Sequence, residues 1–130
     1  MKLLTKLQFE QLTQNGIKNS ATCGSIDFKP VVKFFTPYAA ATWLLTELIP
    51  DEDDLAFGLC DLGLGYPELG YVSLSEISSL TGRLKIERDK YFKAEYSIKI
   101  YADAARSCGH ITEDRNSLLN AYNTNKKGGP

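Results

Sequence analysis

The chain contains three apolar runs joined by connections too short for a crossover, and this pattern restricts its fold more than any other feature. The runs cover 31–35, 41–48 and 55–61, and they are rich in β-branched, aromatic and leucine residues. Such residues are enriched in strands. Parallel strands need a crossover of a dozen or more residues, whereas antiparallel strands can be joined by a tight turn. The sequence therefore predicts an antiparallel meander, with a helix over the second run as the alternative.

A capping box marks the first helix. Thr5 and Gln8 have the T-x-x-Q spacing in which each side chain can bond the other residue's backbone amide. We expect this helix to end at Asn15-Gly16, because glycine readily adopts the left-handed conformation that stops a helix. The small, polar segment 17–28 that follows is predicted to be a mobile loop.

A glycine-rich stretch, GLGYPELG at 63–70, follows the third run. Its glycines and proline predict an irregular turn, after which 69–72 forms a short fourth strand. Ser73 and Glu76 form a second capping box, which starts a helix that ends at Gly82. We interpret the stretch as a strand-to-helix corner, since a dinucleotide site would need the full G-x-G-x-x-G pattern.

The C-terminal part predicts two further helices. Ser97 can cap one that Gly109 ends, and the other reaches about Tyr122. Together these elements predict an α+β fold, with a small, mainly antiparallel sheet of four to five strands packed against N-terminal and C-terminal helices. We expect one globular domain over 1–122 and a flexible tail over 123–130.

The cysteines, the histidine and the apolar runs indicate a cytoplasmic protein. Cys23, Cys60 and Cys108 are scattered and odd in number, which fits a reducing cytosol better than a disulfide framework. One histidine and no C-x-x-C spacing argue against structural zinc, and no cofactor is predicted. No apolar run approaches the roughly 20 residues that span a bilayer. The opening MKLLTKLQF carries charge inside its apolar stretch, so we expect no secretory signal and no membrane contact.

Charge is distributed unevenly along the chain. The segment 34–82 contains eight acidic residues and no lysine or arginine, although the net charge is only −1. If the fold gathers this segment into one face, that face is acidic and suits a protein partner. The predicted partner-binding residues are Trp43, Glu47, Asp51, Glu52, Asp53, Asp54, Glu68 and Tyr71.

Two carboxylates in this segment are weak candidates for catalysis. Asp61 ends a predicted strand and Glu68 precedes the next one, so the two could form an acid–base pair or hold a divalent metal. Asp61 before Leu-Gly is also ordinary turn chemistry. The acidic run 51–54 lacks the spacing and the glycine of an EF-hand, and we interpret it as a solvated loop without a metal.

A basic segment over 83–99 offers a different function. It carries six basic residues, three acids and interleaved aromatic side chains, a pattern compatible with nucleic-acid binding. A solvated face is the simpler interpretation, because Glu87 and Asp89 dilute the positive charge. The nucleic-acid candidates are Arg83, Lys85, Arg88, Lys90, Tyr91 and Lys93.

Several blocks of the sequence resemble a bacterial family catalogued as domain of unknown function 2958. These blocks are VVKFF, WLLTEL, FGLCDLG, PELGYVSLSEI and IERDKYF, in that order, and the resemblance covers about residues 3–111. Members of that family are small proteins encoded on conjugative plasmids and other mobile elements, and the family implies no particular activity. The polar loop at 19–27 and the tail after Thr112 depart from its pattern.

The resemblance and the residues together lead to one preferred function and two alternatives. The preferred function is a non-enzymatic accessory protein of a conjugative plasmid or other mobile element. It would bind an unknown protein partner, such as a host or element-encoded DNA-processing protein, through an acidic surface. The alternatives are a nucleic-acid binder using 83–99 and a metal-dependent enzyme using Asp61 and Glu68.

Overall fold

The structure, a computed structural model, describes residues 3–128 and contains a five-stranded antiparallel sheet with the order β4-β3-β2-β1-β5. The strands are β1 (Val32–Phe35), β2 (Thr42–Ile49), β3 (Glu52–Asp61), β4 (Glu68–Ser73) and β5 (Glu87–Arg88). The helices are α1 (Lys6–Ala21), α2 (Leu74–Ser78), the 3-10 turn η1 (Gly82–Leu84), α3 (Ile98–Cys108) and α4 (Arg115–Gly128). The predicted α+β class and the antiparallel meander are confirmed.

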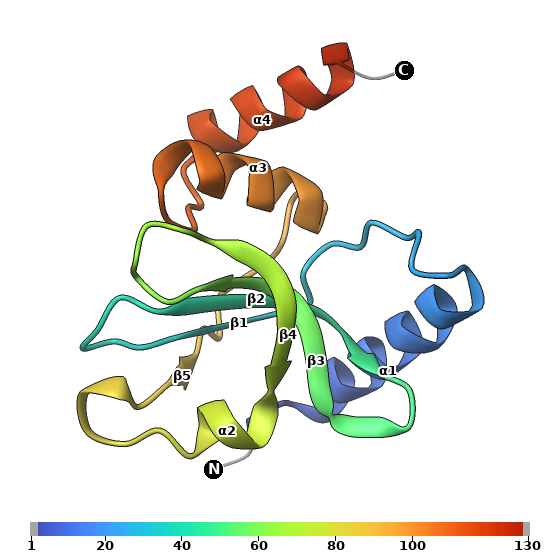
Figure 1. Cartoon of the computed structure of the whole chain (residues 1–130), viewed down its shortest axis with the longest axis vertical. Helices are drawn as coiled ribbons and strands as arrows, with labels where there is room; N and C mark the ends of the chain where they lie inside the picture. Colours follow the sequence, from blue (N-terminus) through green and yellow to red (C-terminus); the bar gives the residue numbers. More distant parts are fainter. Residues whose placement is uncertain (1–2, 129–130) are drawn as a thin grey trace.

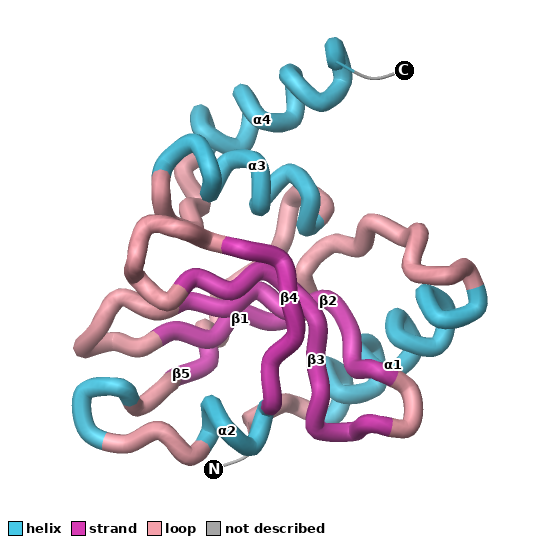
Figure 2. Tube along the Cα trace, in the orientation of Figure 1, coloured by secondary structure: helices cyan, strands magenta, loops and turns pink. Residues whose placement is uncertain are grey.

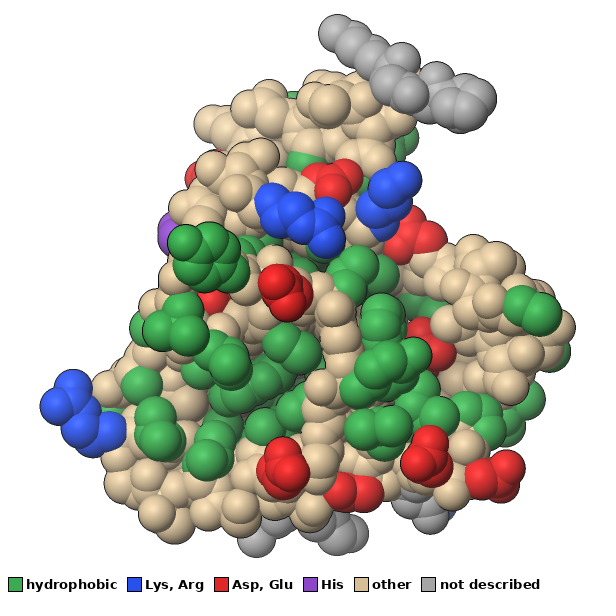
Figure 3. Space-filling view, viewed as in Figure 1, with side chains coloured by type: hydrophobic (Ala, Val, Ile, Leu, Met, Phe, Trp, Pro, Cys, Tyr) green, Lys and Arg blue, Asp and Glu red, His purple; other side chains and the backbone are tan. Residues whose placement is uncertain are grey.

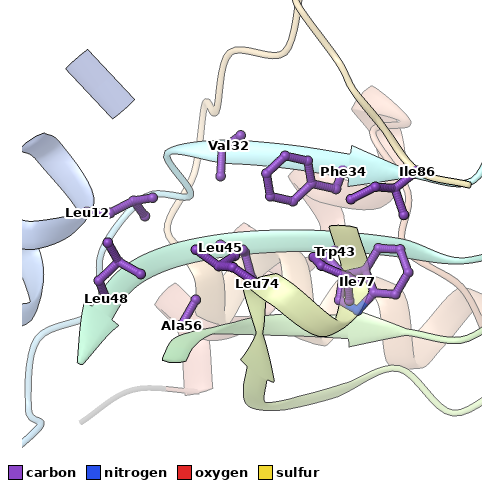
Figure 4. Packing of buried hydrophobic residues seen from close by; sticks show 10 residues of the cluster. All are labelled: Leu12, Val32, Phe34, Trp43, Leu45, Leu48, Ala56, Leu74, Ile77 and Ile86. Carbon is purple, nitrogen blue, oxygen red and sulfur yellow. The ribbon is translucent and has the colours of Figure 1, made fainter. Parts of the chain in front are cut away.

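Helices cover the sheet on both faces, so the core has two parts (Figures 1 and 2). One cluster joins α1 and α2 to the face that carries Trp43 and Leu45, and Figure 4 shows how its side chains meet. The other cluster joins α3 and α4 to the opposite face through Leu44 and Leu59. Alternation along β2 produces this division, because successive side chains of a strand point to opposite faces. No helix in the described part of the chain is long and apolar enough to cross a membrane.

Helix α1 begins as the sequence predicts but ends later. The Thr5 amide donates to Gln8 Oε1 at 3.0 Å, and the Gln8 amide donates to Thr5 Oγ1 at 3.1 Å, which completes the capping box. The predicted stop at Asn15-Gly16 is wrong, because the helix continues to Ala21. Asn15 is buried and donates through Nδ2 to the Thr46 carbonyl at 2.9 Å. A Cβ on Gly16 would lie 1.8 Å from the Leu48 carbonyl oxygen. These two residues therefore bring α1 against β2 instead of ending it.

A β-bulge in β2 reverses the direction of its last side chains. Leu45 pairs with Gly58, but Glu47 pairs with Phe57, so Thr46 is the extra residue. Strict alternation would place Glu47 on the face of Leu45. The bulge moves it to the opposite face instead, because a one-residue shift exchanges the two faces of a strand.

The acidic run 51–54 is mostly strand. The turn is confined to Pro50 and Asp51, and β3 begins at Glu52, so the predicted loop is wrong. The Asp54 carboxylate accepts hydrogen bonds from the hydroxyls of Ser73 and Ser75 and from the Ser75 amide, at the start of α2. The Ser73 hydroxyl, followed by that of Ser75, lowers the pKa of the Asp54 carboxyl below its ordinary value. Asp54 is thus part of the cap of α2.

The C-terminal helices follow the prediction in part. Ser97 precedes α3 as expected, but its side chain makes no capping bond, and Asp27 accepts from the Lys99 amide at 3.0 Å instead. Gly109 ends α3 with a φ of 83°, which confirms the left-handed stop. Helix α4 continues to Gly128, so the end predicted at Tyr122 is wrong. Asn125 donates to Asp103 of α3, which holds this added turn. The last part of the predicted tail, 129–130, lies outside the described residues.

Candidate interaction surface

Five large hydrophobic side chains are exposed along the hairpin formed by β3 and β4. We call them the β4 surface: Leu62, Leu64, Tyr66, Leu69 and Tyr71. Tyr66 is 80% exposed and Tyr71 is 64% exposed. Figure 3 shows hydrophobic side chains gathered over β3 and β4, with acidic side chains along the lower border and basic ones near α3 and at the far left. Contiguous exposed apolar side chains of this kind mark interaction sites more often than single ones do.

Strand β4 is an edge of the sheet. Within the described residues it pairs only with β3, so one side of its backbone faces away from the sheet. Edge strands are commonly protected by lysine, proline or a covering element. Strand β4 has the sequence ELGYVS, without lysine or proline, and its only charge is that of the exposed Glu68. This edge can therefore accept an added strand.

The residues predicted to form one acidic surface are divided between core and surface. Trp43 is 4% exposed and packs in the core, and Glu47 is 5% exposed. Asp54 is exposed but bonded to α2, and the side chain of Asp53 is outside the description. Among the acidic side chains of 34–82 that the structure describes, four are exposed and make no bond like that of Asp54 to α2: Asp51, Glu52, Glu68 and Glu76. The acidic surface is therefore smaller than the sequence suggests.

Asp61 has a structural position. It is 2% exposed, and its two carboxylate oxygens accept from the Gly63 amide at 2.8 Å and the Ile111 amide at 2.9 Å. Glu68 pairs with Cys60, the neighbour of Asp61, so Asp61 and Glu68 point to opposite faces of the sheet. The structure does not bring the two carboxylates together. No group of three or more metal-binding side chains occurs among the residues that the structure describes.

The basic segment 83–99 is partly tied to the fold. The Arg88 guanidinium donates to the Leu3 carbonyl at 2.8 Å, and Asp89 lies 3.6 Å from the ammonium of Lys33, which also contacts Glu113. Tyr91 is 93% exposed. Arg83, Lys85, Lys90 and Lys93 are exposed. Nucleic-acid binding by this segment stays a prediction.

Cys60 belongs to β3, and its partly buried side chain packs against the core cluster of Trp43 and Leu45. Burial raises the pKa of its thiol to about 11, so the thiolate is scarce at neutral pH. Cys23 and Cys108 are exposed free thiols. Cys60 therefore lacks the depressed pKa that activates a catalytic cysteine.

Sequence reasoning missed part of the β4 surface. Leu64 and Tyr66 belong to the glycine-rich stretch 63–70, which the sequence predicts to be a corner, and Leu62 directly precedes that stretch. A signal was present, because apolar side chains in an irregular turn have no strand partner that would bury them. Gly63, with a φ of 82°, and Gly65, with a φ of 88°, turn the chain so that these side chains stay outside.

Comparison with known proteins gives one match. The model of a family described as "Protein of unknown function (DUF2958)" matches residues 3–112. No curated protein and no solved structure matches the chain. The matched region contains the whole sheet, α1, α2, α3 and the β4 surface, and it excludes α4.

Proposed function

The chain belongs to the DUF2958 family, and from this premise we propose that it is a non-enzymatic accessory protein of a conjugative plasmid or another mobile element. It acts by binding a protein partner through the β4 surface, with the exposed acids of the segment 34–82 contributing negative charge. The mobile-element setting is supported by the family blocks that carry the resemblance. The mode of action is supported by the exposed side chains of β4.

The observation that carries this proposal is the combination of exposed apolar side chains with an open strand edge, in a segment whose charges are all negative. Tyr66 and Tyr71 are large and exposed, and aromatic side chains of this kind dominate binding energy at interfaces. The segment 34–82 offers no lysine or arginine, so its exposed charges are all negative. The partner therefore presents an apolar, positively charged segment, and like charges would be repelled.

Capture of the partner from a lysate of the host tests the proposal. The double variant Leu64→Ser/Tyr66→Ser removes two exposed side chains that no part of the core needs. We expect a nuclease-resistant partner to bind the wild type and to bind this variant at least about tenfold more weakly, since two anchors of about 1 kcal/mol each are lost. Quantitative mass spectrometry of the captured proteins provides the measurement.

Tyr91→Ser is the control, because Tyr91 is even more exposed than Tyr66 but lies outside the β4 surface. It should capture the partner as well as the wild type does. Neutralising Glu52 and Glu68 to glutamine tests the charge, whereas Asp54 is left intact because it caps α2. Equal capture by wild type and the Leu64/Tyr66 variant would contradict the proposal. Loss of all captured material on nuclease treatment would favour the basic segment instead.

A further inference from the structure

A small cavity lies on the face of the sheet where the bulge directs Glu47. Its volume is about 140 Å³, and its lining includes Asn19, Gly24, Ile26, Glu47, Phe57 and Tyr71. Glu47, Phe57 and Tyr71 are directly opposite one another on β2, β3 and β4, so the three side chains form one row across the sheet. The row leads from a buried carboxylate to the exposed Tyr71.

The carboxylate of Glu47 has only neutral partners. Asn19 Nδ2 lies 3.0 Å from one oxygen and 2.8 Å from the other, and the Thr46 hydroxyl lies 3.3 Å from Oε1. Among the side chains that the structure describes, no lysine, arginine or histidine forms an ion pair with it. Buried carboxylates are usually paired with a cation, because removing the charge from water is costly. Glu47 is therefore a buried negative charge beside an open space.

The mouth of the cavity suits a cation with an alkyl chain. The rings of Phe57 and Tyr71 pack edge to face with centroids 5.2 Å apart. Aromatic faces attract ammonium groups, and the isoleucines of the lining can pack against methylene groups. Gly24 and Tyr71 are exposed residues of the cavity lining, and Tyr71 also belongs to the β4 surface.

We propose that this cavity binds a single primary ammonium group, namely the side chain of a lysine from the protein partner. The inference rests on the proposed function and names the anchor by which the partner is held. The volume of the cavity is below the roughly 300–1,000 Å³ of pockets that bind drug-sized ligands, and it suits one side chain. The carboxylate is already held in place by Asn19, so pairing requires little further reorganisation of the protein.

An ammonium fits this site better than a guanidinium. Both Glu47 oxygens already accept from Asn19, which leaves no free pair of in-plane positions for a bidentate guanidinium. A compact point charge with three rotatable donors can approach from the cavity without that geometry.

Titration of the ¹⁵N-labelled full chain with n-butylammonium chloride tests the inference without the partner. We expect saturable shifts of the Gly24 and Ile26 amides and of the Asn19 side-chain amide, all of which line the cavity. Sodium butyrate and 1-butanol have the same alkyl chain and should produce no such shifts. Glu47→Gln should weaken binding about tenfold, because a charge-assisted pair is lost. Equal binding by Glu47→Gln, or equal shifts with butanol, would overturn the inference.

Tyr71→Ala provides a second variant that does not depend on the stability of a changed core. Tyr71 is exposed, and its removal should weaken butylammonium binding about threefold by deleting one aromatic wall. If Glu47→Gln fails to fold, unchanged binding by Tyr71→Ala refutes the inference and weaker binding supports it. Absence of ammonium binding, with capture of the partner still dependent on Leu64 and Tyr66, would leave the proposed function in place.

Discussion

Replacing Gly16 with alanine will destabilise the protein strongly, although alanine is the better helix former. In an exposed helix the change would be worth about 1 kcal/mol in favour of alanine. Here a Cβ would lie 1.8 Å from the Leu48 carbonyl oxygen and 3.0 Å from its carbonyl carbon. Both atoms belong to the backbone of β2, so relief requires α1 to move away from the sheet. Overpacking of this kind commonly costs about 1–3 kcal/mol or more, and we expect a net loss of about 2–4 kcal/mol.

Urea unfolding followed by tryptophan fluorescence measures this loss, because Trp43 is the only tryptophan and is buried. Gly70→Ala is the matched control, since nothing lies within 4 Å of the Cβ that it would add. We expect Gly70→Ala to change stability by less than about 1 kcal/mol. A Gly16→Ala variant as stable as the wild type would show that α1 does not pack this closely.

The second large effect is expected for Asp61→Ala. Its two oxygens accept from the backbone amides of Gly63 and Ile111, so one carboxylate joins the end of β3 to the link between α3 and α4. Truncation leaves two amide donors without partners, and each unpaired donor costs about 1–3 kcal/mol of folding free energy where water is excluded. Gly63 is exposed and can bond water, which reduces the total to about 2–4 kcal/mol.

Asp61→Asn should have an intermediate effect, because the amide keeps one acceptor oxygen and turns a donor toward the other backbone amide. The free energy of unfolding of both variants, from the same fluorescence measurement, checks this order. If Asp61→Ala is as stable as the wild type, its carboxylate is dispensable for the fold, and a catalytic role for Asp61 would regain weight.

Local signals in the sequence were sufficient to predict the order of the main strands and helices and some of their ends. Thr5 and Gln8 placed the start of α1, and Gly109 placed the end of α3, because caps depend only on neighbouring residues. The three apolar runs predicted the antiparallel meander correctly, because the short connections between them are too short for the crossover that parallel strands need.

Tertiary packing decided what the sequence could not. Asn15-Gly16 has the composition of a helix stop, but both residues are used to bring α1 close to β2, and no local pattern distinguishes the two uses. The bulge at Thr46 likewise has no local signature. The bulge places Glu47, which the sequence predicts on a partner-binding surface, in the lining of the cavity with Tyr71. The position of Glu47 therefore depends on the pairing of β2 with β3, which the local sequence does not reveal.

The sequence also overstated how many acidic residues of the segment 34–82 are available to bind a partner. Asp54 and Asp61 are acids of the same segment, but one caps α2 and the other fixes a loop. Carboxylates accept backbone hydrogen bonds at helix starts and turns, so an acidic run can have structural duties that composition does not show. Exposed apolar side chains therefore indicate the interaction site better than the acidic count does.

Site-specific photocross-linking in the host tests the central claim most directly. A benzoylphenylalanine at position 66 lies in the β4 surface, and one at position 91 lies in the basic segment, and both positions are highly exposed. We expect irradiation to give a discrete, nuclease-resistant protein adduct from position 66 and none from position 91. An adduct from position 91 alone, or nucleic acid cross-linked there, would contradict partner binding through β4.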